Sequence, residues 1–340
     1  MISCRAYILR ERGVIPSLEH IEVDDNLLEG QVLVRILYSG LCATQLEEIM
    51  VSSRNEKYMP HLFGHEGVAE VIKVGSGATK LVAGDLVVVH WKTSSIGLDA
   101  PPGSYWQGMK KINAGKVVTF TEYSVVPENR LTAVPSNINI ELAAVLGCAY
   151  PTGWGSIRRV GKLIAGERVL IVGIGGVGLA ALSAALKIPK TEIFVADKNQ
   201  RRLSTLAKNF PLVKSIHLSE SILSEIRPNL VIDSSGSPEV HELLVDFCPI
   251  DSRIVLVGMP ARSEKSLINT QRLLDGLQIM GSNGGGIDFG GDSIYFFHDF
   301  KDFLDIDHSF QIFTLGSTEL SKAIDSHKAG AHWKIQLSFS

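Results

Sequence analysis

Three residues that lie far apart in the chain, Cys42, His65 and Cys148, are of types that bind metal ions. Two thiolates and one imidazole suit a tetrahedral zinc ion, and three protein ligands leave the open position that a catalytic zinc needs. A structural zinc normally has four protein ligands, often including a C-x2-C pair, and this sequence contains no such pair. Alone, each residue would more often be a packed side chain. Together the three predict one catalytic zinc site.

A glycine-rich segment predicts a dinucleotide-binding turn. It directly follows the apolar run Arg168–Gly173 and opens an apolar helix expected over Val177–Leu186, while Asp197 ends the next apolar run. In this context the helix N-terminus would bind a pyrophosphate and the acid a ribose. A purely structural turn with a capping Asp is the alternative. The predicted cofactor contacts in the turn are Gly173, Gly175, Gly176, Val177 and Gly178.

The carboxylate of Asp197 bears on the choice of cofactor. It would accept hydrogen bonds from the ribose hydroxyls and repel a 2′-phosphate, which favours NAD over NADP. Lys198, Arg201 and Arg202 follow closely and would weaken that repulsion. We therefore expect NAD, with Lys198 near the cofactor and NADP less favoured.

Composition excludes several classes of function. The net charge of −3 gives no electrostatic case for binding nucleic acid or an anionic membrane. Val169–Leu186 is uncharged and long, but its β-branched start and its glycines indicate strand, turn and helix rather than a membrane span. The first residues lack the apolar stretch of a signal peptide. Four scattered cysteines predict no disulfide framework and hence a cytoplasmic location.

The hydrophobic pattern changes after Gly153. Before it, short apolar runs alternate with turn residues, which predicts a β-rich domain; after it, continuous apolar runs separated by helical segments predict a parallel sheet covered on both faces. The polar segment Lys92–Lys116 is expected to be a long loop. Its Tyr105, Trp106, Lys110 and Lys111 would cover the substrate entrance or form a solvated charged surface. The expected strands are Gln31–Leu37, Gly67–Val74, Asp85–Trp91, Thr121–Val126, Glu192–Asp197, Leu230–Ser234, Arg253–Gly258, Gln278–Asn283 and Ile335–Phe339, and the expected helices include Gln200–Asn209 and Glu239–Phe247.

Several segments resemble those of the zinc-dependent medium-chain alcohol dehydrogenases. The similarity covers essentially the whole chain, including the order of the domains. It implies an α/β fold in which residues 1–152, completed by 285–340, form a GroES-like β-rich catalytic domain. Residues 153–284 would form a doubly wound parallel-sheet Rossmann domain that binds NAD. The segments that carry the resemblance are Gly40–Thr44 (GLCAT), Gly64-His65-Glu66, Thr119–Val126 (TFTEYSVV), Gly147-Cys148 and Thr152-Gly153.

The resemblance implies hydride transfer between an alcohol or polyol, or the matching aldehyde or ketone, and NAD(H), with a zinc-bound alkoxide. Thr44 would begin the proton relay, although a helix N-cap is a compatible structural role. Glu47 stands where many relatives carry the histidine that ends the relay; a solvated helix face is its alternative. Glu66 corresponds to a carboxylate of the family that lies next to the zinc ligands without being one of them. Gln45 replaces an Asp that orients the ligand histidine and would accept its N–H.

The resemblance also assigns residues around the substrate and the cofactor. Trp91 and Tyr150 would line the substrate pocket, although core packing explains Trp91 equally well. Thr152 would contact the cofactor, and Lys334 takes the place of a phosphate-binding arginine. Lys92–Lys116 contains no cysteine, so we expect one catalytic zinc per chain and no structural zinc. Rossmann edge strands pair in relatives, which implies a homodimer or homotetramer.

Two other classes of function remain open. A zinc-free reductase of the same superfamily would act on quinones or enoyl thioesters, but such relatives usually lack the Cys and His set. A catalytically silent NAD-binding sensor or structural protein would need neither Thr44 nor Glu66. The residues therefore favour the alcohol dehydrogenase activity.

Overall fold

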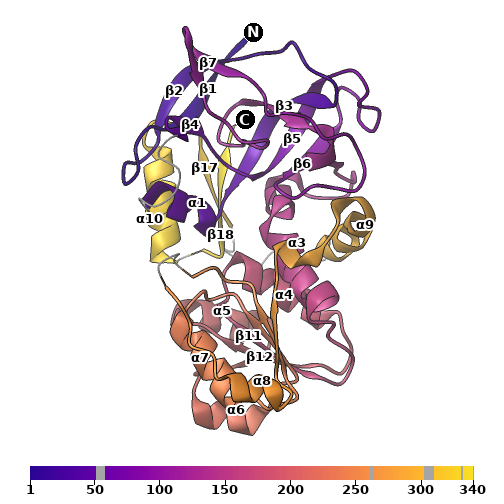
Figure 1. Ribbon diagram of the computed structural model, residues 1–340, viewed down its shortest axis with the longest axis vertical. Coiled ribbons are helices and arrows are strands. Elements are labelled where there is room, and N and C mark those ends of the chain that lie inside the picture. Colours follow the sequence, from indigo (N-terminus) through magenta and orange to yellow (C-terminus); the bar gives the residue numbers. More distant parts are fainter. Residues whose placement is uncertain (51–57, 261–263, 302–309, 331, 340) are drawn as a thin grey trace. The chain divides into compact units, whose positions relative to one another are not determined.

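The computed structural model describes residues 1–50, 58–260, 264–301, 310–330 and 332–339 of the chain (Figure 1). These residues separate into two compact units. The first contains Met1–Cys148 and most of the residues after Ile287, and the second contains Ala149–Ile287.

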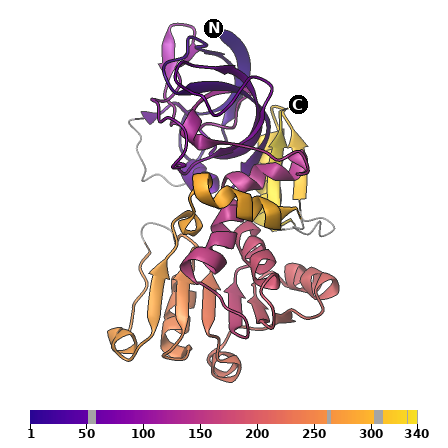
Figure 2. The same cartoon turned by 90° about the vertical axis from the view of Figure 1, so that its right-hand side faces the viewer.

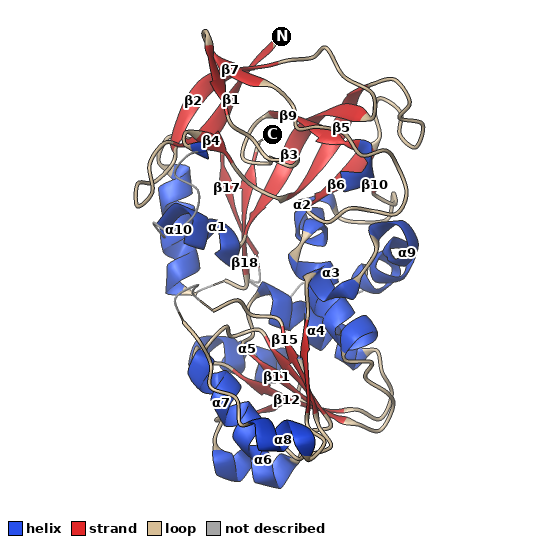
Figure 3. Cartoon of the chain, viewed as in Figure 1, coloured by secondary structure: helices blue, strands red, loops and turns tan. Residues whose placement is uncertain are grey.

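Strands dominate the first unit (Figure 3). One sheet has the strand order β4-β1-β2-β7-β8, and a larger sheet has the order β10-β6-β5-β3-β18-β17, with β9 also paired to β3. The strands are β1 (Ile2–Leu9), β2 (Ser17–Val23), β3 (Gln31–Leu41), β4 (His61–Leu62), β5 (Glu66–Val74), β6 (Leu86–His90), β7 (Tyr105–Gln107), β8 (Lys110–Ile112), β9 (Tyr123–Pro127), β10 (Leu131–Ala133), β17 (Phe310–Thr314) and β18 (Lys334–Ser338). The helices are α1 (Ala43–Met50), α2 (Ile140–Ala143), α9 (Phe289–Phe300) and α10 (Glu319–Ala329).

Strand β3 is the centre of the larger sheet. It pairs antiparallel with β5, β9 and β18, and two register shifts bend it between its partners. Its apolar residues Val32, Val34 and Ile36 lie in a core with side chains of β5 and β6. Leu33 belongs to a different core, shared with β1 and β2, because successive side chains of a strand point to opposite faces. Both faces of β3 are therefore buried over most of its length, with Arg35 exposed.

The second unit is a parallel six-stranded sheet with the order β13-β12-β11-β14-β15-β16. Figure 2 shows these strands side by side, with helices around them. This order is that of a doubly wound dinucleotide-binding fold. The predicted α/β fold, with a β-rich domain and a doubly wound parallel sheet, is confirmed. The strands are β11 (Arg168–Val172), β12 (Glu192–Ala196), β13 (Lys214–Ser215), β14 (Leu230–Asp233), β15 (Arg253–Leu256) and β16 (Gln278–Gly281), and the helices are α3 (Ala149–Gly155), α4 (Gly176–Leu186), α5 (Gln200–Asn209), α6 (Glu220–Ile226), α7 (Pro238–Phe247) and α8 (Thr270–Leu274).

Capping side chains begin α5, α6 and α7 in this unit. Asn199 accepts from the backbone N–H groups of the first turn of α5, and Ser219 and Ser237 cap α6 and α7 in the same way. Pro238 occupies the first turn of α7, where its missing N–H costs nothing. One face of the sheet buries Leu170 and neighbouring strand residues against α6 and α7.

The expected long loop over Lys92–Lys116 is partly wrong, because it contains the hairpin formed by β7 and β8. Tyr105 is fully buried in the core with Ile112, and its hydroxyl bonds to Ser124 and to the backbone of Val125, so it does not cover a substrate entrance. Val169–Leu186 forms β11 and α4, as expected. Among the described residues, no helix is both long and apolar enough to cross a membrane.

A buried histidine joins β6 to α9. The ring of His90 stacks on Phe289 at 3.6 Å between centroids; its Nδ1 donates to the Lys92 carbonyl at 2.7 Å, and its Nε2 accepts from the Thr132 hydroxyl at 3.0 Å. Asp288 caps α9 and accepts from the Ser95 backbone N–H. Burial lowers the pKa of His90 to about 3. The ring is therefore neutral at physiological pH.

We expect the first unit to lose stability in acid through His90. The unfolded chain takes up a proton near pH 6.5, whereas the folded ring resists it down to about pH 3. Stability is thus complete above about pH 6.5, and about 2 kcal/mol is lost as the pH falls to about 5. Chemical denaturation at several pH values should show this slope, and His90→Gln should reduce it. An unchanged slope in the variant would contradict the assignment.

Candidate metal centre and nucleotide-binding turn

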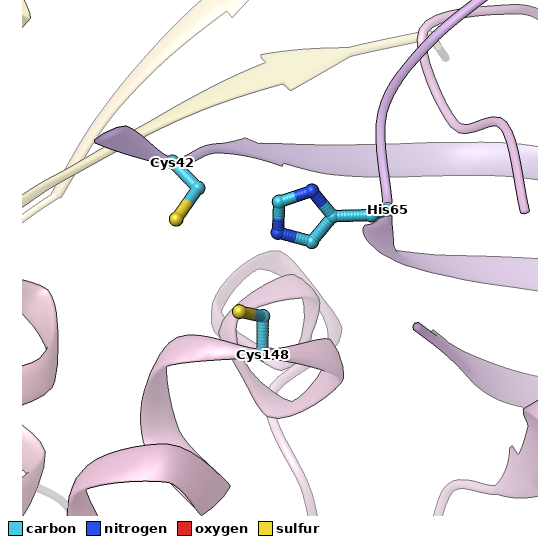
Figure 4. Close-up of side chains that lie close together, drawn as sticks. All are labelled: Cys42, His65 and Cys148. Carbon is cyan, nitrogen blue, oxygen red and sulfur yellow. The ribbon is translucent and has the colours of Figure 1, made fainter. Parts of the chain in front are cut away.

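The fold brings the three predicted metal ligands together within the first unit. Cys42 directly follows β3, and His65 directly precedes β5, so the antiparallel pairing of these strands places the two residues at one end of the sheet. Cys148 follows the short 3₁₀ turn Ala144–Gly147. The two sulfurs and a ring nitrogen lie within 4.8 Å of one another, and Figure 4 shows the three side chains converging.

The Cys148 segment approaches the sheet closely because residue 147 has no side chain. A Cβ atom on Gly147 would lie 2.3 Å from the Val89 carbonyl oxygen and 2.9 Å from the Glu66 Cα. Distances below 3.0 Å require the backbone to shift. Glycine at this position is therefore a requirement for placing Cys148 beside β5 and β6.

The three candidate ligands form hydrogen bonds with one another. The pKa of Cys42 is lowered well below its usual value because the Cys148 thiol donates a hydrogen bond to it, and the Lys334 charge acts in the same direction. The same hydrogen bond, together with burial, raises the pKa of Cys148. Burial opposes protonation of His65, but its hydrogen bond with Cys42 raises its pKa overall. The three donor atoms thus face a common point, and the Cys42 sulfur is the one of the two that ionises more readily.

A buried ion pair lies beside these ligands. Glu66 is fully buried, and its Oε1 accepts from the ammonium of Lys334, which is 5% exposed. Burial raises the pKa of Glu66, although Lys334 opposes this. With both cysteines ionised, the cluster would carry three negative charges and one positive charge. A divalent cation would balance it, and two sulfurs with one imidazole are ligands that zinc prefers. The residues therefore fit a zinc ion.

Helix α1 carries three further predicted residues. The Thr44 hydroxyl lies 3.8 Å from the Cys42 sulfur, in the first turn rather than at an N-cap position. Gln45 is fully buried; its Oε1 accepts from the Cys42 N–H at 2.7 Å, and its amide nitrogen lies against Nδ1 of His65. The sequence had predicted that the amide oxygen would face His65. Glu47 is half-buried on the same helix.

The predicted substrate residues occupy different units. Trp91 directly follows β6 in the first unit and is half-buried. Tyr150 and Thr152 lie in α3 of the second unit; Tyr150 is 1% exposed and Thr152 is 8% exposed. Their roles in binding substrate or cofactor stay predictions.

The second unit contains the glycine turn between β11 and α4. Gly173 follows β11 with a positive φ of 81°, and Gly175 precedes the first turn of α4. The carboxylate of Asp197, at the end of the neighbouring β12, accepts from the Ile174 N–H at 2.6 Å and from the Asn199 N–H at 2.7 Å. Arg202 Nη1 lies 3.7 Å from this carboxylate, and Lys198 is exposed. The turn is thus held before any ligand binds.

Two contacts fix the shape of the turn. A Cβ on Gly178 would lie 1.9 Å from the Gly173 carbonyl oxygen, so α4 can pack against the turn only with glycine there. The Ser234 hydroxyl donates to the same carbonyl oxygen at 2.6 Å. No role for Ser234 was predicted from the sequence. Its position could have indicated a role, because Ser234 directly follows β14. That strand pairs with β11 at the point where the strand order reverses.

Comparisons with known proteins agree with this architecture. Residues 28–136 match the family model of the alcohol dehydrogenase GroES-like domain. An S-(hydroxymethyl)glutathione dehydrogenase from Photobacterium damsela subsp. piscicida is 30% identical over 218 residues, 57% of this chain and 58% of that protein. Alcohol dehydrogenase 6 of Peromyscus maniculatus is 24% identical over 319 residues, 84% of each chain. The crystal structure of benzyl alcohol dehydrogenase from Acinetobacter calcoaceticus covers all of both chains with a TM-score of 0.84 at 23% identity.

These similarities show an alcohol dehydrogenase GroES-like domain over residues 28–136 and a chain that is similar to zinc-type medium-chain alcohol dehydrogenases. The match to the Photobacterium protein spans less than two thirds of that protein's length. The structural similarity, at 23% identity, supports the fold.

We expect Gly178→Ala to destabilise the second unit. Its methyl group would overlap the Gly173 carbonyl, and overpacking of this kind typically lowers the free energy of unfolding by about 1–3 kcal/mol. Gly175→Ala is the matched control, because its Cβ meets nothing within 4 Å and its φ of −87° suits alanine. Chemical denaturation should show the control within about 0.5 kcal/mol of the wild type. Equal stability of both variants would contradict the packing argument.

Proposed function

We propose that this protein is a zinc- and NAD-dependent alcohol dehydrogenase that transfers a hydride between an alcohol or polyol, or the matching carbonyl compound, and NAD(H). The observation that carries the proposal is the convergence of Cys42, His65 and Cys148 in a chain whose second unit has a complete dinucleotide turn. A metal site with one open position and a hydride acceptor are the two components that this reaction needs.

The chain's own residues would bind the reactants and move the proton. Cys42, His65 and Cys148 would hold the zinc, which when bound supplies Lewis-acid polarisation of the substrate oxygen, while NAD supplies the hydride acceptor. The Thr44 hydroxyl, 3.8 Å from the Cys42 sulfur, would take the alcohol proton and pass it on. Glu47, half-buried on the same helix, would receive it or leave it to water.

The cofactor would bind mainly through the second unit. The N-terminal N–H groups of α4, next to Gly173, Gly175, Gly176, Val177 and Gly178, would hold the pyrophosphate, and Asp197 the adenosine ribose. We also propose cofactor contacts for Thr152, Lys198 and Lys334. Because Lys334 already donates to Glu66, a phosphate would have to share its ammonium group.

The substrate is proposed only as a class. Trp91 and Tyr150 would limit the size of the alcohol, as bulky aromatic side chains do in a pocket.

Two thiolate ligands must stay reduced, so we place the enzyme in the cytoplasm. The same two cysteines weigh against a zinc-free reductase, and the neighbouring Thr44 and Glu66 against a silent NAD-binding protein.

We further propose a homo-oligomer that pairs through β16. This strand is the last in the order of the six-stranded sheet, so one of its edges is open within the described residues. Leu267 and Leu274, which precede it in the chain, are each 80% exposed. A second copy of the chain would cover both the open edge and these apolar side chains. A monomeric mass in sedimentation velocity would contradict this proposal.

Replacing Cys148 by Ala should remove both the zinc and the alcohol oxidation. We expect about one zinc per chain in the wild type and none in the variant. Turnover should fall by about 10³-fold or more as transition-state charge loses its stabilisation. Binding of NAD, measured by fluorescence titration, should persist. Cys4→Ala is the control, since Cys4 is buried apart from the cluster. Retained turnover without zinc would refute the proposed mechanism.

Asp197→Asn should weaken the preference for NAD. An amide oxygen can still accept from Ile174 or Asn199, so the turn should persist, but the negative charge that repels a 2′-phosphate is lost. We expect the ratio of kcat/KM for NAD to that for NADP to fall at least about tenfold, which corresponds to about 1.4 kcal/mol. Steady-state kinetics with both cofactors measures this ratio. An unchanged ratio would mean that Asp197 does not face the ribose.

A further inference from the structure

Gln45 connects two groups of the proposed metal centre through one amide. Its side chain is fully buried, so water does not reach it. Its Oε1 accepts from the backbone N–H of Cys42 at 2.7 Å, and its Nε2 lies within hydrogen-bond distance of Nδ1 of His65. Both neighbours are proposed zinc ligands. The orientation of a single amide therefore affects two ligands at once.

The proton positions follow from the chemistry of these groups. A backbone N–H can only donate, so the oxygen of Gln45 faces Cys42 and the NH₂ group faces His65. An amide NH₂ can also only donate, so Nδ1 of His65 is an acceptor without hydrogen. The neutral ring then carries its proton on Nε2. Figure 4 shows that this nitrogen points toward the two sulfurs.

Zinc binding requires the opposite tautomer. A metal takes the lone pair of Nε2, so the ring proton must reside on Nδ1, where it would face the NH₂ group of Gln45. Turning the amide by half a rotation would present its oxygen to this proton. The NH₂ group would then face the N–H of Cys42. In either orientation one buried N–H lacks an acceptor, whereas a carboxylate would accept from both.

We propose that Gln45 is a positioning residue that makes zinc binding conditional on a tautomer exchange of His65 and a turn of its own amide. The site then holds zinc less tightly than the same site with a carboxylate at this position. This inference rests on the proposed zinc site, but not on alcohol turnover. Gln45 would thereby tune metal exchange in this chain.

The first experiment measures zinc affinity by competition with a chromophoric chelator. Gln45→Glu keeps the length of the side chain and provides two acceptors, so it should bind zinc about 10- to 100-fold more tightly than the wild type, the range typical of such outer ligand contacts. Gln45→Met keeps the shape without any acceptor and should bind more weakly. Ala43→Glu is the charge control: Ala43 is exposed, and its added carboxylate should change the affinity by less than about threefold. Equal affinities of the wild type and Gln45→Glu would overturn the proposal.

The second experiment reads the tautomer directly by ¹⁵N NMR of the His65 ring. In the wild type, Nδ1 should be unprotonated without metal and protonated with zinc; in Gln45→Glu, it should be protonated in both states. A protonated Nδ1 in the metal-free wild type would overturn the inference while leaving the zinc site intact. Folded wild type and Gln45→Glu that both fail to bind zinc would instead overturn the proposed metal site and this inference with it.

Discussion

The pairing of β3 with its neighbours determines the geometry of the candidate metal centre. Cys42 ends this strand, His65 and Glu66 begin the paired strand β5, and Lys334 begins β18 on the other side. A shift of one residue in either register would turn these side chains to the opposite face of the sheet. Because both faces of β3 are buried against separate cores, such a shift would also expose apolar side chains. The register of β3 with its neighbours therefore fixes both the packing of the two cores and the geometry of the metal centre.

This constraint explains how the chain tolerates a buried ion pair. Removing Glu66 and Lys334 from water costs several kcal/mol per ion, and their attraction offsets this only with good geometry. β3 separates and aligns the strands that carry them, so little entropy is lost when they meet. The Cys148 thiol lowers the pKa of Cys42 by donating a hydrogen bond to it, and the positive charge of Lys334 acts in the same direction. Both contacts favour the thiolate form of Cys42.

Sequence predicted the features that depend on local pattern and not those that depend on distant partners. The β-rich and parallel-sheet parts, the glycine turn and most strand positions follow from periodicity and turn residues. The hairpin containing Tyr105 was missed because its strands have three residues each, too few to show alternation. The partner of Lys334 was not predictable, since Glu66 lies 268 residues away. The amide orientation of Gln45 needed the position of the Cys42 N–H, which no pattern reveals.

The differences expected from the resemblance to zinc-dependent alcohol dehydrogenases lie around the metal ligands rather than in the nucleotide turn. The two sites differ physically in a way that would account for this. The turn is limited by steric contact, because a Cβ on Gly178 would lie 1.9 Å from a carbonyl oxygen and no other residue type avoids the overlap. The surroundings of the metal act through charge and hydrogen bonds, which several residue types can provide. Lys334 can replace an arginine as a positive charge, and Gln45 can replace an acid as an acceptor for one N–H at a time. Each difference is compatible with the fold, and we expect it to change how firmly a ligand is held.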